Sequence, residues 1–421
     1  MAQLSRGEWR DGWPVVAAAA IGIGSGPGLF QNLSSLFTPG IMAEFGWSRG
    51  AIGTAAGLGL LGALAAPVLG RAADRAGVRA MIAGAMLLLA AAYAGFAAMT
   101  GRLWQYQALI VCLALTVPGT GALVYGKLIA ARFGRHRGLA LAAGTSGLSL
   151  TTLALPPLLA IVIARGGWRS GFLALALAVA AIALPAVLLL LRRAPTVLVR
   201  PGIAVTLPGM TGRTARRTPR FWALGGAAAL VNLATVGLVT QMVPFGLDRG
   251  LTPGGAALLL TSYGAAQIVG RFTIGWLVDR FPAPRMAAAT AIVSAAGFAG
   301  LQLHAPGLGL ALLLVFAAGL MNGADSDVLP FLASRLFGLK AYGEVYGSLL
   351  ILALFGTAAG VVGFGRLHDA TGGDGAALAI AAAGMVVAAL LFLTLGRAAA
   401  AAGGGHFASD PAASSLYADH E

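Results

Sequence analysis

Long apolar runs alternate with short polar connections along almost the whole chain of 421 residues. Most of these runs contain about twenty residues or more, the length that a helix needs to cross about 30 Å of hydrocarbon at 1.5 Å per residue. The strands of a membrane barrel would appear as alternating segments of about ten residues, and the sequence shows no such pattern. We therefore predict that the chain crosses a membrane as helices, which satisfy their own backbone hydrogen bonds.

The apolar runs form two sets of six, separated by the longest polar interruption, residues 192–221, which holds seven arginines and no acidic residue. The predicted spans cover residues 13–38, 51–70, 77–99, 104–131, 137–164, 168–192, 220–246, 253–279, 283–304, 306–334, 341–367 and 375–396. The predicted fold is an all-α membrane protein with 12 transmembrane helices in two pseudo-symmetric six-helix bundles, residues 13–192 and 220–396. The remaining segments are expected to be a cytoplasmic N-terminus (1–12), a basic cytoplasmic linker (193–219) and a disordered cytoplasmic tail (397–421).

Composition and charge agree with this pattern. Hydrophobic residues make up 58% of the chain and charged residues 10%, whereas roughly a quarter of the residues in a soluble domain are charged. The net charge of +14 does not indicate nucleic acid, because 20 of the 28 Lys and Arg fall on the side of the N-terminus and only six on the other. By the positive-inside rule both termini are cytoplasmic. We expect a multi-pass protein of the cell inner membrane that contacts lipid.

A short motif occurs at the same place in each half of the chain. GRAADRAGVR (residues 70–79) follows the second predicted span and GWLVDRFPAPR (residues 275–285) follows the eighth, so both halves share G-x-x-x-D-R. The glycine lets helices approach closely, the acid is favoured near a helix N-terminus, and the arginine can bridge to the opposite half. Repeats related by an axis along the membrane normal are typical of transporters that rock about a site at the midplane.

With this motif the sequence resembles the major facilitator superfamily over essentially its whole spanning region. The resemblance implies a secondary transporter of 12 helices, with a central cavity lined by the first, second, fourth and fifth helices of each half. It also implies that the motif residues latch the cytoplasmic face in the outward-open state. The latch residues are then Gly70, Asp74, Arg75, Arg79, Gly275, Asp279 and Arg280.

Within that superfamily the chain is similar to the branch of monocarboxylate porters and oxalate/formate antiporters. DGWPVV (residues 11–16), LFTPGIMAEFGWSRG after the first span and RGLALAAGTSG (residues 137–147) look like parts of this branch. Arg271 stands in the place of the eighth-helix arginine that pairs with a carboxylate substrate there. The chain departs from the animal members at Gln267, where they carry an acid, and at Gln31, where they carry a lysine. Its eleventh span has no counterpart of the antiporter's second basic residue.

Arg271 is also informative without the resemblance, because it lies eight residues, about 12 Å of helix, before Asp279 at the end of its span. A charge at such depth costs a few kcal/mol on insertion scales and usually points to a cavity or a partner. The planar guanidinium matches a carboxylate with two hydrogen bonds. We interpret Arg271 as an anchor for an anion. The alternative is a structural arginine that holds backbone carbonyls or a neighbouring acid.

The tenth span supplies two acids, Asp325 and Asp327, at a depth close to that of Arg271. Positions two residues apart differ by about 200° around a helix. One acid is therefore expected to pair with Arg271 and the other to pack inward, and the sequence leaves open which does which. A substrate that arrives at Arg271 would release the paired acid to take up a proton, which gives proton symport a physical route. A purely structural Arg–Asp bridge is the alternative.

Further polar side chains within the spans are candidates to shape the pocket, although each fits an interhelical hydrogen bond as well. Two of them follow the sequence SGPG, whose Gly and Pro loosen the first helix near its middle. The candidates are Gln31, Asn32, Tyr125, Asn232, Gln241, Tyr263 and Gln267.

Other kinds of chemistry are disfavoured. The one cysteine, Cys112, allows no disulfide framework and no thiolate metal cluster, and the five histidines show no metal-ligand spacing. The sequence contains no nucleophile elbow, Walker loop or H-E-x-x-H motif. We therefore expect no metal, no cofactor and no enzymatic activity, and an ion or substrate gradient in place of ATP as the energy source.

The sequence predicts a secondary active transporter, a monomer, that moves a small organic anion, in particular a monocarboxylate, by alternating access with proton-coupled symport. Arg271 would hold the carboxylate and Asp325 or Asp327 would carry the proton. Two alternatives share the fold: a drug/proton antiporter that uses the acids as a cation site, and an anion exchanger. A non-transporting membrane sensor usually adds a soluble signalling domain, for which residues 192–221 and the tail are too short and too polar.

Overall fold

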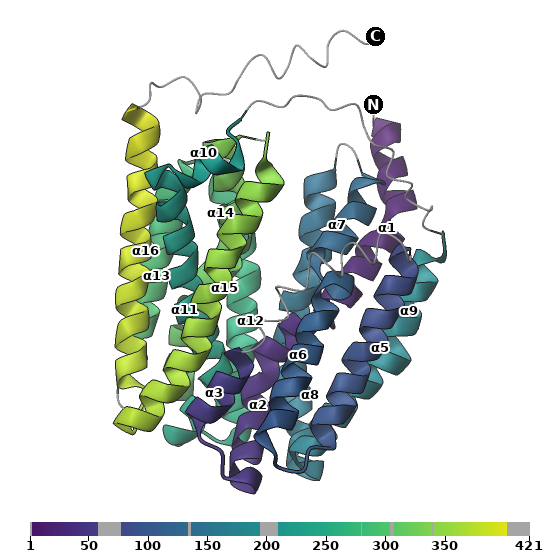
Figure 1. Cartoon of the computed structure of the whole chain (residues 1–421), viewed down its shortest axis with the longest axis vertical. Coiled ribbons are helices and arrows are strands. Elements are labelled where there is room, and N and C mark those ends of the chain that lie inside the picture. Colours follow the sequence, from purple (N-terminus) through teal and green to yellow (C-terminus); the bar gives the residue numbers. More distant parts are fainter. Residues whose placement is uncertain are drawn as a thin grey trace.

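The chain folds into two bundles of helices that stand side by side, as the computed structural model in Figure 1 shows. The structure describes residues 2–57, 77–133, 136–193, 209–278, 280–303, 307–338 and 340–401. Within those ranges the regular elements are helices, apart from an isolated β-bridge between Gly209 and Gly338. The first helix begins and the last helix ends at the same end of the molecule (Figure 1). We call this end the terminal face and the opposite end the far face.

The N-terminal bundle contains helices that were predicted as separate spans and some that divide a span. Its elements are α1 (Ala2–Gly24), α2 (Pro27–Phe45), α3 (Arg49–Gly57), α5 (Val78–Ala97), α6 (Leu103–Thr120), α7 (Ala122–Ala130), α8 (Arg137–Leu177), a π-helical segment (Ala178–Ala183), α9 (Leu184–Leu190) and a 3-10 turn (Leu191–Arg193).

The C-terminal bundle follows the predicted spans closely. Its elements are α10 (Gly212–Arg216), α11 (Pro219–Asp248), α12 (Pro253–Val278), α13 (Ala283–Gly300), α14 (Leu308–Phe337), α15 (Tyr342–Thr371) and α16 (Gly375–Ala401). In the described part of the chain, eight helical stretches are long and apolar enough to cross a membrane. The second predicted span, 51–70, lies outside the described residues beyond Gly57.

Breaks in the N-terminal bundle coincide with glycine and proline. The first predicted span is two helices, because Gly26 adopts an extended conformation and Pro27 starts α2. α6 gives way to α7 at Gly121. The fifth and sixth spans join into α8, whose break is Gly167 with a φ of 75° that favours glycine. Helix α1 begins at Ala2, so the predicted N-terminal segment is itself helical and not merely a lead-in to the first span.

The two bundles meet most closely from mid-depth to the far face, where glycines bring helix backbones together. A Cβ on Gly264 of α12 would lie 2.6 Å from the backbone nitrogen of Leu153 in α8. A Cβ on Gly365 of α15 would lie 2.5 Å from the carbonyl oxygen of Arg49 in α3. Small residues permit this kind of approach between membrane helices. Figure 1 shows α3 and α15 crossing toward the far face, and the close backbone contact at Gly365 closes that part of the interface.

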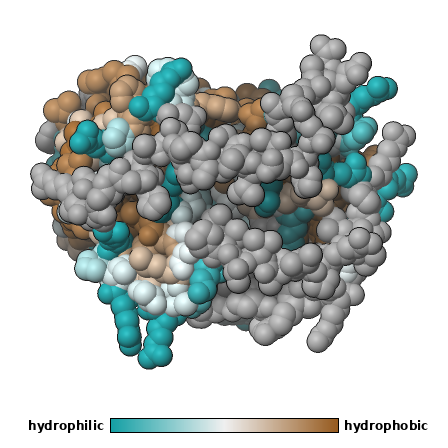
Figure 2. Space-filling model, turned by 90° about the horizontal axis from the view of Figure 1, so that it is seen from above, coloured by the Kyte–Doolittle hydropathy of each residue, from teal (hydrophilic) through white to brown (hydrophobic). Residues whose placement is uncertain are grey.

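Large apolar side chains lie on the outside of both bundles. Leu177 and Ile182 are 66% and 70% exposed in the N-terminal bundle, and Leu313 and Phe355 are each 63% exposed in the C-terminal bundle. Figure 2 looks onto the terminal face, where hydrophilic side chains stand out between areas of hydrophobic residues. An apolar perimeter of this kind is what a bilayer requires of a spanning protein.

Candidate functional site

Arg271 contacts both bundles. It sits on α12, and its side chain is only 12% exposed. Its Nη1 donates a hydrogen bond to the Thr145 hydroxyl oxygen on α8, at 2.7 Å. Its Nε lies 3.4 Å from Oδ2 of Asp327 on α14. A single guanidinium therefore joins the N-terminal bundle to the carboxylate-bearing helix of the C-terminal bundle, at the depth where the sequence predicted a substrate anchor.

A small cavity adjoins this guanidinium. Its volume is about 60 Å³, and its lining comes from α8, α12 and α14. The lining residues are Thr145, Leu148, Ser149, Gln267, Arg271, Asn322, Gly323 and Ser326. Hydroxyl and amide groups predominate, and the one cation among them is Arg271. Such a lining offers hydrogen bonds around a single positive charge, which suits a small anion.

The two acids on α14 have different partners. Asp327 faces Arg271 and its side chain is 39% exposed. Asp325 points to α11, where its Oδ2 accepts a hydrogen bond from the Asn232 amide nitrogen at 3.2 Å. Its Oδ1 is buried without a hydrogen-bond partner among the described residues. The two carboxylates thus face different neighbours, as expected from their spacing on the helix. Asp327 lies beside the arginine and Asp325 packs inward.

A chain of polar contacts fixes the floor of the cavity. The Gln267 amide nitrogen donates to the Asn322 side-chain oxygen at 2.7 Å, and the Asn322 amide nitrogen donates to the Thr235 hydroxyl oxygen at 3.0 Å. The Tyr263 hydroxyl donates to the Thr235 backbone carbonyl at 3.3 Å. These bonds link α12, α14 and α11, so Gln267 is held in place and its buried Oε1 remains without a hydrogen-bond partner among the described residues.

Of the seven other predicted pocket residues, Gln267 alone lines this cavity, and the six that do not are Asn232, Tyr263 and four more. Asn32 donates to the Thr152 hydroxyl oxygen at 2.8 Å and ties α2 to α8. Tyr125 is completely buried in the N-terminal bundle. Gln241 is 3% exposed on α11, and Gln31 is half-buried on α2. At these positions the structure shows packing or interhelical contacts away from Arg271.

The predicted latch is described only in part. Gly70, Asp74, Arg75 and Asp279 lie outside the described residues. Arg79 donates to the backbone carbonyl of Leu191.

The second copy of the motif shows one further contact. The Arg280 guanidinium stacks over the Trp276 ring, 3.9 Å from its centroid. No described atom lies within 4 Å of the place where Gly275 would carry a Cβ. The described contacts of Arg79 and Arg280 are local to their own bundles, so the latch stays a prediction.

Several lining residues were not singled out by the sequence. Thr145 and Ser149 are hydroxyl residues on α8, and on α14 Asn322 precedes the two acids and Ser326 lies between them. Thr145 lies within the quoted stretch RGLALAAGTSG. The sequence did contain a signal for Asn322 and Ser326, because they are four residues apart and so share one face of the helix.

Comparisons with known proteins agree on the fold. The chain matches the family described as Major Facilitator Superfamily over residues 17–254. It is 30% identical to monocarboxylate transporter 11 of Homo sapiens over 383 residues, which cover 87% of this chain and 73% of that protein.

Solved structures of transporters share this arrangement of helices. One is a bacterial homolog of the human lysosomal transporter Spinster in an inward-facing and occupied conformation, with a TM-score of 0.66 and 17% identity, covering 91% of this chain and 96% of that one. A second is the nucleoside transporter NupG, with a TM-score of 0.68 and 15% identity over 91% and 98% of the two chains. A third is the E. coli fucose:proton symporter FucP, at 0.57 and 17% over 90% and 98%.

Proposed function

Because the chain belongs to the major facilitator superfamily and is therefore a membrane transporter and not an enzyme, we propose that it moves a small organic anion, a monocarboxylate, by proton-coupled symport. The single observation that carries this proposal is the guanidinium of Arg271, which lies at depth beside a polar cavity and contacts both bundles. The similarity to a monocarboxylate transporter supports the same class of substrate.

The anchoring role follows from the unfilled bonding capacity of Arg271. A guanidinium carries N–H donors in a planar fork that fits both oxygens of a carboxylate. Here one donor is used by the Thr145 hydroxyl, and the Asp327 carboxylate stands at the loose distance of 3.4 Å. A substrate carboxylate that enters the cavity can therefore replace the longer contact with two shorter, charge-assisted hydrogen bonds.

Size favours a short acid. The cavity of about 60 Å³ is far below the roughly 300–1,000 Å³ of pockets for drug-sized ligands. A bulky amphipathic drug does not fit this site as it stands, which places the monocarboxylate ahead of the drug/proton antiporter. Leu148, the apolar member of the lining, would contact the short aliphatic part of such a substrate.

Proton coupling is assigned to Asp327. With the site empty, its charge balances that of Arg271 across 3.4 Å. When a substrate carboxylate takes the guanidinium, a second negative charge arrives, and two like charges in a poorly solvated site are unfavourable. Protonation of Asp327 removes the conflict, so one substrate and one proton move together and the loaded site has the same net charge as the empty one. Asp325, bonded to Asn232, keeps an inward structural role.

The remaining parts of the proposal follow the distribution of charge. The terminal face would be cytoplasmic, because the connections on that side carry the excess of Lys and Arg. The far face would then open to the outside of the cell inner membrane, and the motif residues around Arg79 and Arg280 would latch the cytoplasmic side. The transporter would act as a monomer, with each chain holding its own substrate cavity.

Proteoliposome uptake tests the proposal directly. We expect an inwardly directed proton gradient to drive accumulation of radiolabelled lactate or a similar short monocarboxylate, and short monocarboxylates to compete while amphipathic cations do not. Arg271→Lys should weaken binding of the acid in a thermal-shift titration, because a bound ligand raises the melting temperature by mass action. If the gradient drives no carboxylate uptake and Arg271→Lys binds like the wild type, the proposal fails. Competition by cations alone would instead favour the drug antiporter.

Equal uptake with and without the gradient, dependent on a carboxylate inside the vesicle, would identify an anion exchanger. This outcome would keep Arg271 as the anchor and remove the proton from the mechanism.

A further inference from the structure

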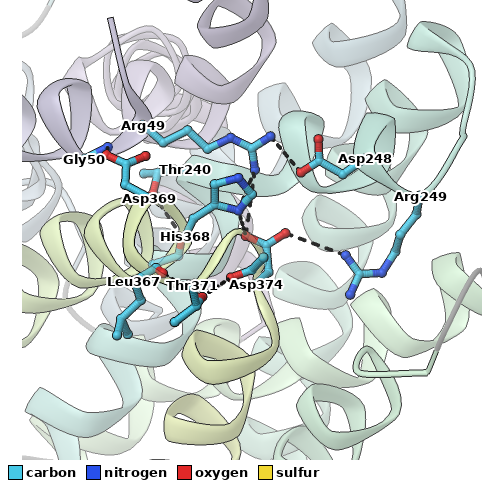
Figure 3. Close-up of polar contacts among 12 residues, drawn as sticks. Arg49, Gly50, Thr240, Asp248, Arg249, Leu367, His368, Asp369, Thr371 and Asp374 are labelled. Carbon is cyan, nitrogen blue, oxygen red and sulfur yellow. Dashed lines mark hydrogen bonds and ion pairs between the residues drawn. The ribbon is translucent and has the colours of Figure 1, made fainter.

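A second group of charged side chains joins the two bundles at the far face, at the opposite end of α11 and α15 from the terminal face (Figure 3). We call it the far-face cluster; its members are Arg49, Asp248, Arg249, His368 and Asp374. Arg49 is the first residue of α3 and is the one member from the N-terminal bundle. The others lie where α11 and α15 end and where α16 begins.

Three atoms of the C-terminal bundle converge on the Arg49 guanidinium. Its Nη2 donates to Oδ2 of Asp248 at 2.7 Å. Its Nη1 lies 3.3 Å from Nδ1 of His368 and 3.8 Å from Oδ1 of Asp374. The Arg49 side chain is only 7% exposed, and its Nε is buried without a hydrogen-bond partner among the described residues. The Arg49 guanidinium is thus a buried cation surrounded by two carboxylates and an imidazole of the C-terminal bundle.

A tight turn at the end of α15 positions the imidazole and one of these carboxylates. Helix α15 ends with Gly372, whose φ of 72° favours glycine and whose N–H donates to the His368 carbonyl at 2.8 Å. The turn brings Asp374 back to His368, so that Oδ1 of the acid lies 2.9 Å from Nδ1 of the ring. On its other side, Oδ2 of Asp374 faces Arg249 at 3.6 Å, and the Arg249 guanidinium stacks 3.8 Å from the Phe245 centroid.

The same three residues are grouped closely enough that they could hold a metal ion. One oxygen of Asp248, one nitrogen of His368 and one oxygen of Asp374 all lie within 4.8 Å of one another. Zinc binds imidazole nitrogen and carboxylate oxygen at about 2.0–2.2 Å, so its ligand atoms stand about 3.4 Å apart in a tetrahedron. Asp248 is 41% exposed at the end of α11, and a rotation of its side chain would have to close the remaining gap.

The Nδ1 atom of His368 cannot satisfy Arg49 and Asp374 at the same time. A guanidinium can only donate, so the approach of Arg49 requires an unprotonated Nδ1, whereas the carboxylate at 2.9 Å requires a protonated one. Whichever tautomer is present, one of the two contacts is unsatisfied. A metal ion satisfies both groups, since it binds the unprotonated nitrogen and the carboxylate oxygen together.

We propose that Asp248, His368 and Asp374 form a cation site that Arg49 fills while the far face is closed, and that binds a divalent transition-metal ion when Arg49 leaves. The mixture of one imidazole and two carboxylates selects zinc over calcium or magnesium, which prefer oxygen ligands only. Zinc in the site blocks the return of Arg49 and holds the far face open. The inference rests on the alternating movement in the proposed function and is independent of which substrate is carried.

Zinc binding by full-length protein is the first test. Zn²⁺ is titrated calorimetrically into purified Arg49→Gln, in which the tethered cation is removed, and into Arg49→Gln/His368→Ala. We expect one zinc per chain in the single variant and at least about tenfold weaker binding in the double variant. The other histidines are present in both proteins, so the difference reports His368 alone. A second double variant, Arg49→Gln/Asp248→Asn, should lose the same site. Identical titrations of the single variant and both double variants would overturn the proposal.

A distance measurement then tests the consequence for the fold. Spin labels are attached at Arg102→Cys and Gln302→Cys, which lie on far-face connections of the two bundles and are exposed, in a Cys112→Ala background. We expect zinc to add a longer distance in the protein with an intact cluster and not in the His368→Ala version. The inference would be contradicted if zinc left the distribution of distances between the labels unchanged, or changed it equally with and without His368→Ala. No carboxylate is in the sample, so failure here leaves the substrate proposal standing.

Discussion

Two arginines reach across the interface between the bundles, one from each side, and they differ in how fully they are satisfied. Arg271 of α12 has one hydroxyl at 2.7 Å, one acid at 3.4 Å and a cavity beside it. Arg49 of α3 has an acid at 2.7 Å and two further groups within 3.8 Å, where α3 packs closely against α15. A guanidinium that has a cavity and one loose ion pair beside it suits a ligand, and one that several groups of the opposite bundle hold suits a lock.

The difference has a physical basis in the helices that surround each arginine. Around Arg271, hydroxyl and amide side chains leave space and offer a single carboxylate on the same bundle. Around Arg49, the ends of three helices and a glycine turn supply two carboxylates and an imidazole. Helix ends are near water, where charges can be gathered at low cost, whereas at mid-depth each added charge costs a few kcal/mol. The two sites therefore differ in charge count because they differ in depth.

Replacement of each arginine by glutamine gives the largest expected contrast. Arg271→Gln should weaken carboxylate binding at least about thirtyfold, because loss of one partner of a buried charged pair costs about 2–5 kcal/mol. Arg49→Gln should leave carboxylate binding within about threefold of the wild type, since it does not touch the cavity. Thermal-shift titration with the acid measures both. Equal losses in the two variants would erase the distinction between a binding arginine and a locking arginine.

The two acids of α14 give the next largest contrast. Asp327→Asn should abolish accumulation driven by a proton gradient while carboxylate exchange continues, because the group that takes the proton is lost and Arg271 remains. Each unit of pH difference stores about 1.4 kcal/mol per proton, enough for about tenfold accumulation, so the loss is readily measured in vesicles.

Asp325→Asn is the matched control for this prediction. The amide fills the same space beside Asn232, and gradient-driven accumulation should persist. If Asp325→Asn uncouples transport and Asp327→Asn does not, the assignments of the two acids are reversed.

The outcome for these acids shows how far the sequence alone reaches. The spacing of Asp325 and Asp327 predicted that they would face apart, because helix geometry is local. Which one meets Arg271 depends on the rotation of α14 against α12 and α11, and this is set by tertiary contacts such as Asn322 with Thr235. Composition and hydropathy likewise predicted a helical membrane protein, since the length of apolar runs is a property of the chain itself, and the superfamily was inferred from the resemblance of the repeated motif.

Other parts of the site depended on information that no single segment carries. Thr145 belongs to the N-terminal bundle, and its contact with Arg271 exists only because Gly264 lets α12 approach α8. The far-face cluster could not be foreseen for the same reason, because its residues come from separate helix ends that lie far apart in the sequence. Tyr125 illustrates the opposite error, because a polar side chain on a cavity-forming helix was a reasonable candidate and is instead buried in its own bundle.

Removal of the Arg49 contact should have a moderate effect on the equilibrium between a closed and an open far face. Arg49→Gln breaks a buried contact between bundles and should shift the population toward an open far face about tenfold, measured as the labelling rate of a cysteine introduced beside the interface at Thr54. Arg169→Gln is the control, because Arg169 also pairs with a far-face acid, Glu44, but within its own bundle and with 36% and 42% of the two side chains exposed. Exposed pairs contribute little, about 0–1 kcal/mol. Similar labelling in both variants would mean that surface charge, and not the contact between bundles, sets the balance.

The smallest predicted effect comes from removal of a single hydroxyl, that of Thr145 beside Arg271. It tests whether Arg271 behaves as a binding arginine or as a locking arginine. Thr145→Val keeps the shape of the side chain but removes the acceptor at 2.7 Å from Arg271. Ser146→Ala removes the neighbouring hydroxyl, which instead donates to the Ala142 carbonyl of its own helix at 2.7 Å. A hydrogen bond to a charged group contributes about 1.5–3 kcal/mol net, and part of this free energy is regained when the substrate takes the donor. Thr145→Val should therefore change carboxylate affinity by about fivefold. Ser146→Ala should change it by less than about twofold. The direction is informative. Weaker binding means that the hydroxyl orients the guanidinium for substrate, whereas tighter binding means that it competes with substrate for the same donor, as a lock would.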